Sequence, residues 1–267
     1  SKGIWQIEIG KDFGTYRTVW IDSRYDSNEY GKKIIGKMVP EASFDFPKSL
    51  WNVYDCIYAV VGKKKNAIIL DYFAGSGTTG HAVLKLNNED NGTRQFILCT
   101  NNENQIAESV TYPRMKSAIK GYKVSETVKE KGLDGNLRYF KTSFVLNSRN
   151  KDQLKIDITK KCTEMLCLKE GIYNLLKDHT ENDEPVWKIF KQNNRYLAVY
   201  YDFSGKPLEL LRKEMNKISG DKVLYCFTTN TYGLDKHNFS DWENIRLEPI
   251  PQKILDVYKR IFKGNDK

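Results

Sequence analysis

Histidine is scarce in this chain of 267 residues, with three examples at positions 81, 179 and 237, and no apolar run is long enough to span a membrane. The five cysteines are an odd number and share no metal-site spacing with the histidines, so a zinc site is not indicated. No charged-then-apolar segment resembles a secretion leader. We therefore expect a cytoplasmic protein with reduced, mostly buried thiols, no metal and no membrane contact.

Basic residues exceed acidic ones, but not in one place. The chain has 43 Lys and Arg against 34 Asp and Glu, a formal net charge of +9. A basic surplus attracts phosphate backbones. Because these charges are spread along the chain, they support contact with nucleic acid only weakly, and an ordinary basic protein fits them as well.

The most informative segment is residues 66–83, where an apolar run meets three closely spaced glycines. Ala67–Leu70 predicts a buried strand, and Gly75, Gly77 and Gly80 follow it in G-x-G-x-x-G spacing. In this arrangement the backbone N–H groups of the turn lie against a ligand at a helix N-terminus. The segment predicts a nucleotide-type cofactor site, although the glycines do not name the ligand.

The side chains around the glycines separate three candidate ligands. A phosphate-binding loop needs Lys and then Ser or Thr after its last glycine, but His81 and Ala82 stand there. A dinucleotide would bring its pyrophosphate near Asp71, and like charges roughly 4 Å apart cost about 4 kcal/mol at an effective dielectric constant of about 20. S-adenosylmethionine has cationic ammonium and sulfonium groups, which an acidic strand end attracts. A tight turn without ligand is the remaining alternative.

The same residues resemble a known family. The string Asp71-Tyr-Phe-Ala-Gly-Ser-Gly-Thr-Thr-Gly-His-Ala-Val-Leu is similar to the cofactor half of amino-group DNA methyltransferases, in particular the modification subunit of type III restriction-modification systems. Upstream, Phe44-Asp-Phe-Pro-Lys-Ser resembles the Phe-x-x-Pro-Lys-Pro segment of that family, with Ser49 at the final Pro. Downstream, Arg94, Phe96–Leu98 and Thr111–Tyr122 match its second strand and the following helix. The likeness covers residues 15–145 well and the rest loosely.

This resemblance implies a partial Rossmann-like α/β core, S-adenosylmethionine as cofactor, and double-stranded DNA as the partner whose adenine amino group is methylated. It also implies a set of cofactor-binding residues. On the turn these are Asp71, Phe73, Ala74, Gly75, Ser76, Gly77, Thr78 and Thr79. At the methionine end of the cofactor they are Phe44, Phe46, Pro47, Lys48 and Ser49.

The end of the second strand is expected to contact the ribose of the cofactor. In related folds an acidic side chain at this position binds the ribose hydroxyls. Here the strand ends in Thr100-Asn-Asn-Glu, so the acid is displaced to Glu103, and Asn101 or Asn102 is a possible substitute. Glu103 equally fits the first turn of the next helix, where an acid is favourable.

One family motif is missing. Amino-group methyltransferases carry Asp, Asn or Ser before Pro-Pro and an aromatic residue, which bind and stack on the flipped-out base. This chain has no Pro-Pro pair, and Glu248-Pro-Ile-Pro lacks the aromatic and fits a helix-entry loop. We expect no catalytic residue in this chain, which then corresponds to the C-terminal part of a longer enzyme or one half of a split enzyme.

The pattern predicts two domains, a partial methyltransferase domain at 1–135 and a small α+β domain at 136–267. In the first, strands are expected at Ile4–Ile9, Tyr16–Ile21 and Gln95–Thr100, and helices at Lys48–Val61, Gly77–Leu86 and Gln105–Lys120. Lys63–Lys65 is expected to serve the helix end before it, with contact to a DNA backbone as the alternative.

The second domain is expected to mix strands and helices without a catalytic constellation. The predicted elements are a strand Leu137–Val145, a long helix Leu154–Lys177, a polar link Asp178–Pro185, a hairpin Val186–Phe203, a helix Pro207–Ile218, strands Val223–Thr228 and Ile245–Leu247, and a helix Gln252–Phe262. Tyr196, Tyr200, Tyr201 and Phe203 fit a buried sheet face, with stacking on unpaired bases as the alternative. By resemblance, this domain contacts a second copy of the chain or a restriction subunit.

The sequence therefore predicts the cofactor-binding portion of an adenine-specific DNA methyltransferase. A non-catalytic DNA-binding or assembly module with a methyltransferase-like fold is the competing hypothesis. A nicotinamide oxidoreductase is a third, which binding of NAD in place of S-adenosylmethionine would favour.

Overall fold

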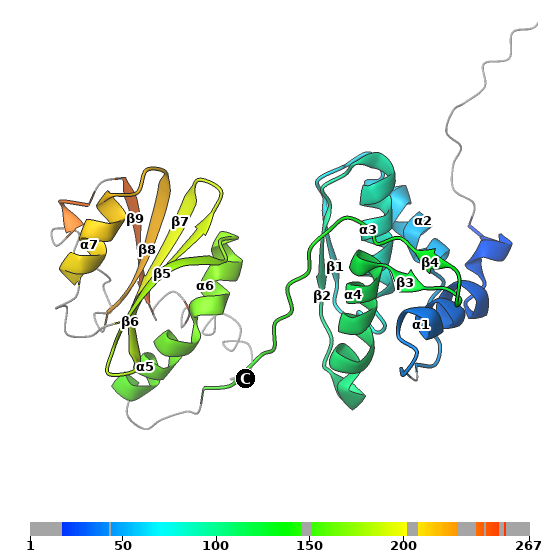
Figure 1. The fold of residues 1–267 in the computed structure, drawn as a ribbon, viewed down its shortest axis with the longest axis horizontal. Coiled ribbons are helices and arrows are strands. Elements are labelled where there is room, and N and C mark those ends of the chain that lie inside the picture. The colour runs from blue at the N-terminus through cyan, green and yellow to red at the C-terminus, as the bar shows by residue number, and fades with distance from the viewer. Residues whose placement is uncertain are drawn as a thin grey trace, which may run out of the picture. The chain divides into compact units, whose positions relative to one another are not determined.

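A computed structural model describes residues 18–42, 44–145, 151–201, 208–228, 239–242, 244–250 and 254. The chain forms two compact units, Ser1–Lys141 and Thr142–Lys267, with the division six residues after the one expected at 135. Each unit is described by itself (Figure 1). Among the described residues, no helix is both long and apolar enough to cross a lipid bilayer.

The first unit is built around a strand-helix-strand element. Strand β1 (Ile68–Asp71) leads into helix α3 (Thr78–Asp90) and then into β2 (Gln95–Leu98). The strands pair in parallel, with Leu70 opposite Ile97 and Asp71 opposite Leu98. This confirms the element expected from the glycine pattern, with a longer helix and a shorter second strand than predicted.

Helices complete this unit. A 3-10 turn (η1, Ser23–Tyr25), a π turn (η2, Asn28–Lys32) and helix α1 (Lys33–Met38) precede α2 (Leu50–Val61), which begins two residues later than predicted. The expected helix 105–120 is a 3-10 turn (η3, Glu103–Gln105), a π turn (η4, Ala107–Thr111) and α4 (Tyr112–Lys120). Two short antiparallel strands follow, β3 (Tyr122–Lys123) and β4 (Lys129–Glu130).

Arg94 joins the ends of two helices in this unit. Its side chain is fully buried and donates to the carbonyl oxygens of Val61 and Gly62, at the end of α2, at 3.3 and 2.7 Å. The same guanidinium forms an ion pair with Asp90 at the end of α3, at 2.9 Å. Lys65 Nζ donates to the carbonyl of Asp90 at 2.6 Å. This lysine therefore caps the end of α3, whereas the prediction placed it at the end of α2.

Two predicted strands, one in each predicted domain, are wrong where the structure describes them. Residues 18–21 of the strand predicted at 16–21 are bends and irregular chain, and residues 137–145 form no strand. Both segments have aromatic residues, but neither has a described strand beside it with which to pair, and an isolated extended segment is not a stable strand. The predicted strand at 4–9 lies outside the described residues.

The second unit is a five-stranded mixed sheet with helices. Its order is β5-β6-β7-β8-β9, formed by Asn174–Glu181, Glu184–Gln192, Arg195–Tyr200, Asp221–Phe227 and Ile245–Ile250. The first three strands pair antiparallel, and β7, β8 and β9 pair in parallel. Helices α5 (Lys151–Lys161) and α6 (Thr163–Glu170) precede the sheet, and α7 (Leu208–Asn216) connects β7 to β8.

Three predictions for this unit are confirmed: the hairpin that turns at Asn193-Asn194, the helix at 207–218, which is α7, and the strand at 223–228, which is β8. The long helix predicted at 154–177 is confirmed as far as α5 and α6 but is interrupted at Cys162, and it is wrong beyond Glu170, because the chain leaves α6 at Gly171, which has a left-handed φ of 67°. The supposed polar link contains the end of β5 and a tight turn at Asn182 and Asp183. Residues 248–250 lie in β9 and not in a helix-entry loop, and the predicted helix 252–262 lies outside the described residues apart from Ile254.

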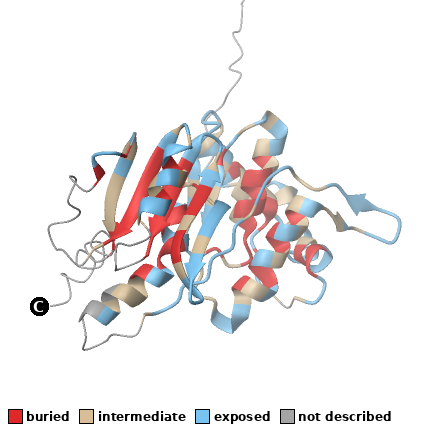
Figure 2. Ribbon diagram, turned by 60° about the vertical axis from the view of Figure 1, so that its left-hand side comes forward, coloured by how far each residue is buried: buried red, intermediate tan, exposed pale blue. Residues whose placement is uncertain are grey.

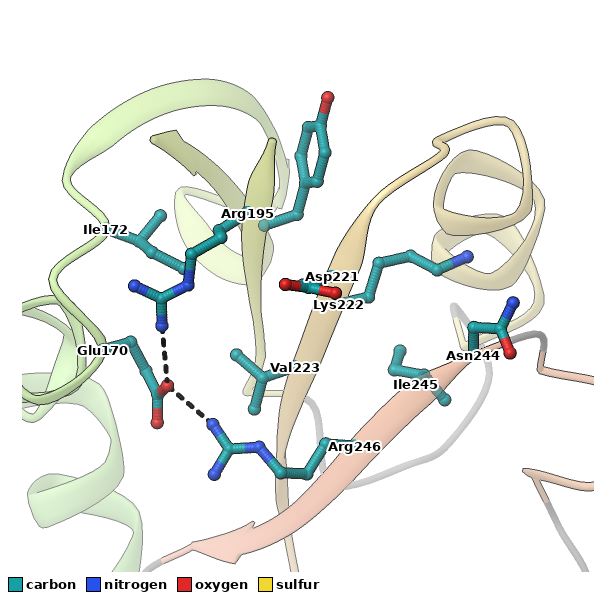
Figure 3. A pocket seen from close by; sticks show the side chains of 10 residues that line it. Glu170, Ile172, Arg195, Asp221, Lys222, Val223, Asn244, Ile245 and Arg246 are labelled. Atoms are coloured by element: carbon teal, nitrogen blue, oxygen red, sulfur yellow. Dashed lines mark hydrogen bonds and ion pairs between the residues drawn. The ribbon is translucent and has the colours of Figure 1, made fainter. Parts of the chain in front are cut away.

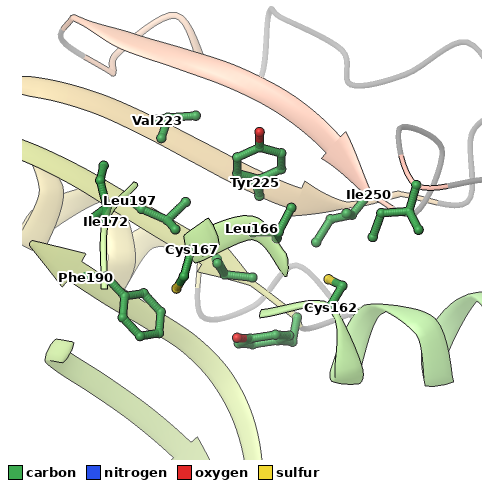
Figure 4. Packing of buried hydrophobic residues seen from close by; sticks show 12 residues of the cluster. Cys162, Leu166, Cys167, Ile172, Phe190, Leu197, Val223, Tyr225 and Ile250 are labelled. Atoms are coloured by element: carbon green, nitrogen blue, oxygen red, sulfur yellow. The ribbon is translucent and has the colours of Figure 1, made fainter. Parts of the chain in front are cut away.

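Buried residues line the strands of the second unit and the helices of the first (Figure 2). One cluster packs Leu166 and Cys167 of α6 against Leu197, Val223 and Tyr225 of the sheet (Figure 4). Tyr196, Tyr200 and Tyr201 are 8%, 2% and 2% exposed. These three rings therefore belong to the core and have no open face for a base, whereas Phe203 lies outside the described residues.

Candidate functional site

Asp71 ends strand β1 with its carboxylate turned toward the glycine turn. One carboxylate oxygen accepts from the backbone N–H of Phe73 at 3.1 Å, and the other accepts from the hydroxyl of Thr79 at 2.6 Å. Asp71 is only half-buried, so a ligand can reach it. The sequence predicts an acidic side chain beside the glycine turn, and the structure places Asp71 there.

Glycine is required at the three positions for two different structural reasons. Gly75 and Gly77 adopt left-handed φ values of 49° and 77°, which most side chains rarely adopt. Gly80 lies against α4 and β2, because a Cβ there would come within 2.9 Å of Met115 and 3.0 Å of Leu98. Two glycines thus shape the turn, and the third allows α3 to pack closely.

The turn offers donors to a ligand at the start of α3. Gly77 N–H donates to the carbonyl of Ala74 at 2.7 Å, and Ala74 N–H donates to Cys99 at 2.9 Å, which fixes the turn to the end of β2. The N–H groups of Gly75 and Ser76 have no acceptor among the residues that the structure describes. Free N–H groups at a helix N-terminus attract anionic or polar oxygen atoms.

Residues of η4 and α4, which the sequence argument did not assign to the site, hold the turn from behind. Thr111 Oγ1 donates to the carbonyl of Gly75 at 2.6 Å. Arg114 is fully buried and donates from one nitrogen, Nη1, to Ser76 Oγ at 3.0 Å, Ser76 O at 3.3 Å and Thr78 Oγ1 at 2.8 Å. The sequence signal that could have assigned these residues to the site is their spacing: Thr111 and Arg114 are polar residues three positions apart in the helical segment that follows the second strand.

His81 lies beside this arginine on the first turns of α3. Burial and the positive charges of Arg114 and Lys85 lower the pKa of His81 to about 3, and its Nδ1 has no hydrogen-bond partner among the described residues. The imidazole is therefore neutral near pH 7. His81 cannot supply the cation that a phosphate-binding loop takes from its lysine.

The residues after β2 fall into two groups: one side chain caps the next helical segment, and others remain exposed. Asn102 Oδ1 accepts from the N–H of Ala107 at 2.9 Å and so caps the next helical segment. Glu103 is exposed and begins η3, with the Asn101 amide at 3.5 Å from its carboxylate. Thr100 accepts weakly from the N–H of Asn102 at 3.4 Å. Glu103 and Asn101 are thus the side chains at this end that remain open to solvent.

The segment Phe44–Ser49 contributes one ring to the turn. The Cζ atom of Phe44 lies 3.7 Å from the position of a Cβ on Gly75. Phe46 and Lys48 are exposed, whereas Pro47 and Ser49 are buried and Ser49 Oγ donates to the carbonyl of Arg24 at 2.7 Å. The structure therefore brings Phe44 to the turn and gives Ser49 a role at the start of α2.

Left-handed backbone conformations occur on both segments that flank the glycine turn. Phe46, Asn102, Asn104 and Gln105 have φ values between 51° and 62°. Asn adopts such values readily, whereas for Phe46 and Gln105 they cost on the order of 1 kcal/mol or more each. Strain of this kind is typical of functional sites, and these two residues lie on either side of the turn in the sequence.

One face of the β1–β2 sheet is open. Ile68, Leu70 and Ile97 are 66%, 61% and 51% exposed, and Tyr72 and Phe73 beyond the strand are 67% and 87% exposed. Parallel sheets in folded proteins are normally covered on both faces. Among the described residues, β1 also pairs on one side alone. The unit therefore presents an unpaired strand edge and an apolar sheet face beside the candidate site.

The second unit has a separate cavity of about 480 Å³ at the beginnings of β7, β8 and β9 (Figure 3). Glu170, at the end of α6, accepts from Arg246 at 2.6 Å and from the buried Tyr225 hydroxyl at 2.7 Å, and Arg195 lies 3.8 Å away. This network fastens α6 to the sheet and includes no nucleophile beside a base. No cluster of metal-ligating side chains occurs among the described residues of either unit.

Comparison with known proteins supports the expectation for the first unit. Residues 7–111 match the family described as DNA methylase. Over 90 residues the chain is 43% identical to the type III restriction-modification enzyme StyLTI Mod subunit of Salmonella typhimurium strain LT2, covering 32% of this chain and 14% of that protein.

Two further relatives match segments of similar length. Over 86 residues the chain is 42% identical to the type II methyltransferase M.KpnI of Klebsiella pneumoniae, covering 32% of this chain and 20% of that protein. Over 90 residues it is 33% identical to the type III restriction-modification enzyme EcoPI Mod subunit of Escherichia phage P1, covering 33% and 13%. The expected resemblance to type III modification subunits is confirmed for a part of the chain that spans less than a quarter of these relatives.

Proposed function

From this likeness to DNA methylases, we propose that the chain is the cofactor-binding and C-terminal part of a type III modification subunit. The first unit is then part of a Rossmann-like methyltransferase core. Its function is to bind S-adenosylmethionine for methyl transfer to the exocyclic amino group of adenine in double-stranded DNA. The protein acts in the cytoplasm as one component of a restriction-modification system.

The observation that carries this proposal is the position of Asp71 at the glycine turn. Its carboxylate accepts hydrogen bonds from Phe73 N–H and the Thr79 hydroxyl, which lie on either side of the bend. The N–H groups of Gly75 and Ser76, which have no acceptor among the described residues, lie on the same turn. This donor and acceptor set fits a ligand with a cationic ammonium group and polar oxygen atoms. It opposes a pyrophosphate, whose charge has the sign of the carboxylate.

When bound, S-adenosylmethionine supplies the methyl group, and the residues of this chain bind and orient it. Asp71 attracts the ammonium group, the turn contacts the amino-acid end, and Phe44 packs beside Gly75. Glu103 or Asn101 at the end of β2 contacts the ribose. Attack by the adenine amine needs alignment more than covalent help, so accurate positioning provides much of the rate.

The base-binding Pro-Pro-aromatic motif must come from another segment of the enzyme, since the chain contains no Pro-Pro pair. The exposed Ile68, Leu70 and Ile97 and the unpaired edge of β1 support this part of the proposal. A segment that pairs with the free edge of β1 and packs a helix on the apolar face would complete the sheet and place the target base near the methyl donor. The second unit contacts a second copy of the subunit or the restriction subunit.

Reconstitution tests this function. The chain is mixed with a separately purified segment that has the Pro-Pro-aromatic motif and the target-recognition region, together with S-adenosylmethionine labelled on its methyl group and duplex DNA. Mass spectrometry of the digested nucleosides should find labelled N6-methyladenine with both segments and none with either alone. Labelled cytosine, or no transfer from a stable two-segment complex, would contradict the proposal.

A further inference from the structure

Arg114 is an unusual residue to find completely buried beneath a glycine turn. Its Nε and Nη2 atoms have no hydrogen-bond partner, and no carboxylate pairs with it, in the part of the chain that the structure describes. Burying a cation without a counter-charge is strongly unfavourable, and an apolar side chain of similar size would fill the same space more favourably. Packing by itself therefore does not explain this residue.

The contacts of Arg114 all lead to the turn. Its Nη1 donates to the main chain and side chain of Ser76 and to the side chain of Thr78, the first residue of α3. Burial lowers the pKa of Arg114 to about 10, so the guanidinium remains protonated near pH 7. The neighbouring His81 is neutral at that pH. Arg114 is thus a fixed positive charge behind the start of α3.

The turn is consequently contacted by two groups of opposite charge. Asp71 provides a carboxylate that accepts from Phe73 N–H and the Thr79 hydroxyl. The charge of Arg114, bonded to Ser76 and Thr78, adds to the positive end of the α3 dipole and to the N–H groups of Gly75 and Ser76. A site of this kind orients a zwitterion, with its ammonium at the acid and its carboxylate at the helix N-terminus.

We infer that Arg114 is a positioning residue that orients the amino-acid end of the cofactor by attracting its α-carboxylate through the turn, while Asp71 attracts its ammonium. The inference rests on the proposed function and adds to it the basis for recognising one end of the ligand. It assigns a charge role to a residue that touches the turn and does not touch the ligand.

Two ligands that differ by one group test this role. S-adenosylmethionine and its decarboxylated analogue share the adenosine, sulfonium and ammonium groups, and the analogue lacks the carboxylate. Calorimetry with the full chain should show weaker binding of the analogue to the wild type. Arg114→Met should weaken binding of S-adenosylmethionine about tenfold or more, equivalent to roughly 1.4 kcal/mol, and change binding of the analogue little.

Controls separate this role from a structural one. Arg94→Met also removes a fully buried arginine, but one that contacts Asp90 at the opposite end of α3 from the turn, and it should affect both ligands alike. Arg114→Gln keeps a polar side chain with N–H donors and removes the charge, so it should lose the preference for the carboxylate even where Arg114→Met fails to fold. Equal weakening of both ligands by Arg114→Gln would overturn the inference while leaving the proposed function intact. Failure of the wild type to bind either ligand would overturn both.

Discussion

Asp71 accepts hydrogen bonds from Phe73 and Thr79 and is half-buried at the end of β1. Asp71→Asn keeps the shape and most of the hydrogen bonding of this side chain but removes its charge. We expect this change to weaken binding of S-adenosylmethionine about tenfold or more, since a charge-assisted contact contributes about 1.5–3 kcal/mol. Calorimetry measures the change directly.

The matched control is Asp241→Asn, which removes an exposed acid 3.1 Å from Arg212 in the second unit. This control should bind S-adenosylmethionine as the wild type does. Equal affinity of the two variants would show that the charge of Asp71 has no part in recognition.

His81 makes the first unit sensitive to acid. Its pKa falls from 6.5 to about 3 in the folded chain because burial and nearby positive charge disfavour the protonated imidazole. Between these values the unfolded chain binds a proton that the folded chain does not, so stability is full above pH 6.5 and falls as the pH decreases. The maximal loss is about 1.4 kcal/mol for each pH unit below 6.5.

His81→Gln should therefore flatten the pH dependence of the stability of α3 between pH 4.5 and 6.5. Hydrogen exchange of the α3 amides measures this stability without interference from the second unit. His179→Gln, in β5, should leave the slope unchanged. A slope in His81→Gln equal to that of the wild type would show that His81 is not buried as a neutral group.

At the residue scale, the sequence predicted Asp71 and the glycines because strand, bend and charge follow each other within a few positions. It did not predict Arg114, whose partners Ser76 and Thr78 lie 38 and 36 positions away. Local patterns do not encode contacts at such separation. The same reason hid the hydrogen bond from Thr111 to Gly75.

At the scale of elements, Arg94 is the principal link between helix ends in the first unit. It joins the final carbonyls of α2 to Asp90 and Asn87 of α3 from a fully buried position. Arg94→Met leaves these carbonyls and the Asp90 carboxylate without their donor. We expect a loss of about 3 kcal/mol in the free energy of unfolding of this unit, measured by urea denaturation.

The control is Lys33→Met, which removes the exposed ion pair between Lys33 at the start of α1 and Glu29 of η2. Its effect should be below about 1 kcal/mol, as for other surface pairs. Similar losses in the two variants would mean that Arg94 does not connect the helices as described.

Elements with a strong local signal were predicted well, and elements defined by pairing were not. Helix α2 and the hairpin turning at Asn193-Asn194 have clear periodicity or turn residues. Strand β5 has a helix-like composition and largely exposed side chains, and its strand conformation comes from pairing with β6. A one-dimensional pattern gives no information on that partner, so the end of α6 at Gly171 was missed.

At the scale of the whole molecule, the proposed assembly with a second segment depends on the open face of the β1–β2 sheet. Ile97 is 51% exposed on this face. Ile97→Glu should leave the free energy of unfolding of the chain within about 0.5 kcal/mol of the wild type, as for surface changes. The same change should abolish methyl transfer in the reconstituted mixture, because the charge would be buried on assembly.

Leu168→Glu is the matched control, since Leu168 is 54% exposed on α6 and belongs to the second unit. It should retain methyl transfer in the reconstituted mixture. Full activity of Ile97→Glu would contradict the role of this sheet face in assembly, whatever the cofactor.

The central claim is that the acid beside the glycine turn selects a cationic methyl donor over an anionic dinucleotide. The most direct measurement is calorimetric titration of the wild-type chain with S-adenosylmethionine and, separately, with NAD under the same conditions. The account predicts saturable binding of S-adenosylmethionine that Asp71→Asn weakens, and no binding of NAD. Binding of NAD without binding of S-adenosylmethionine would contradict it.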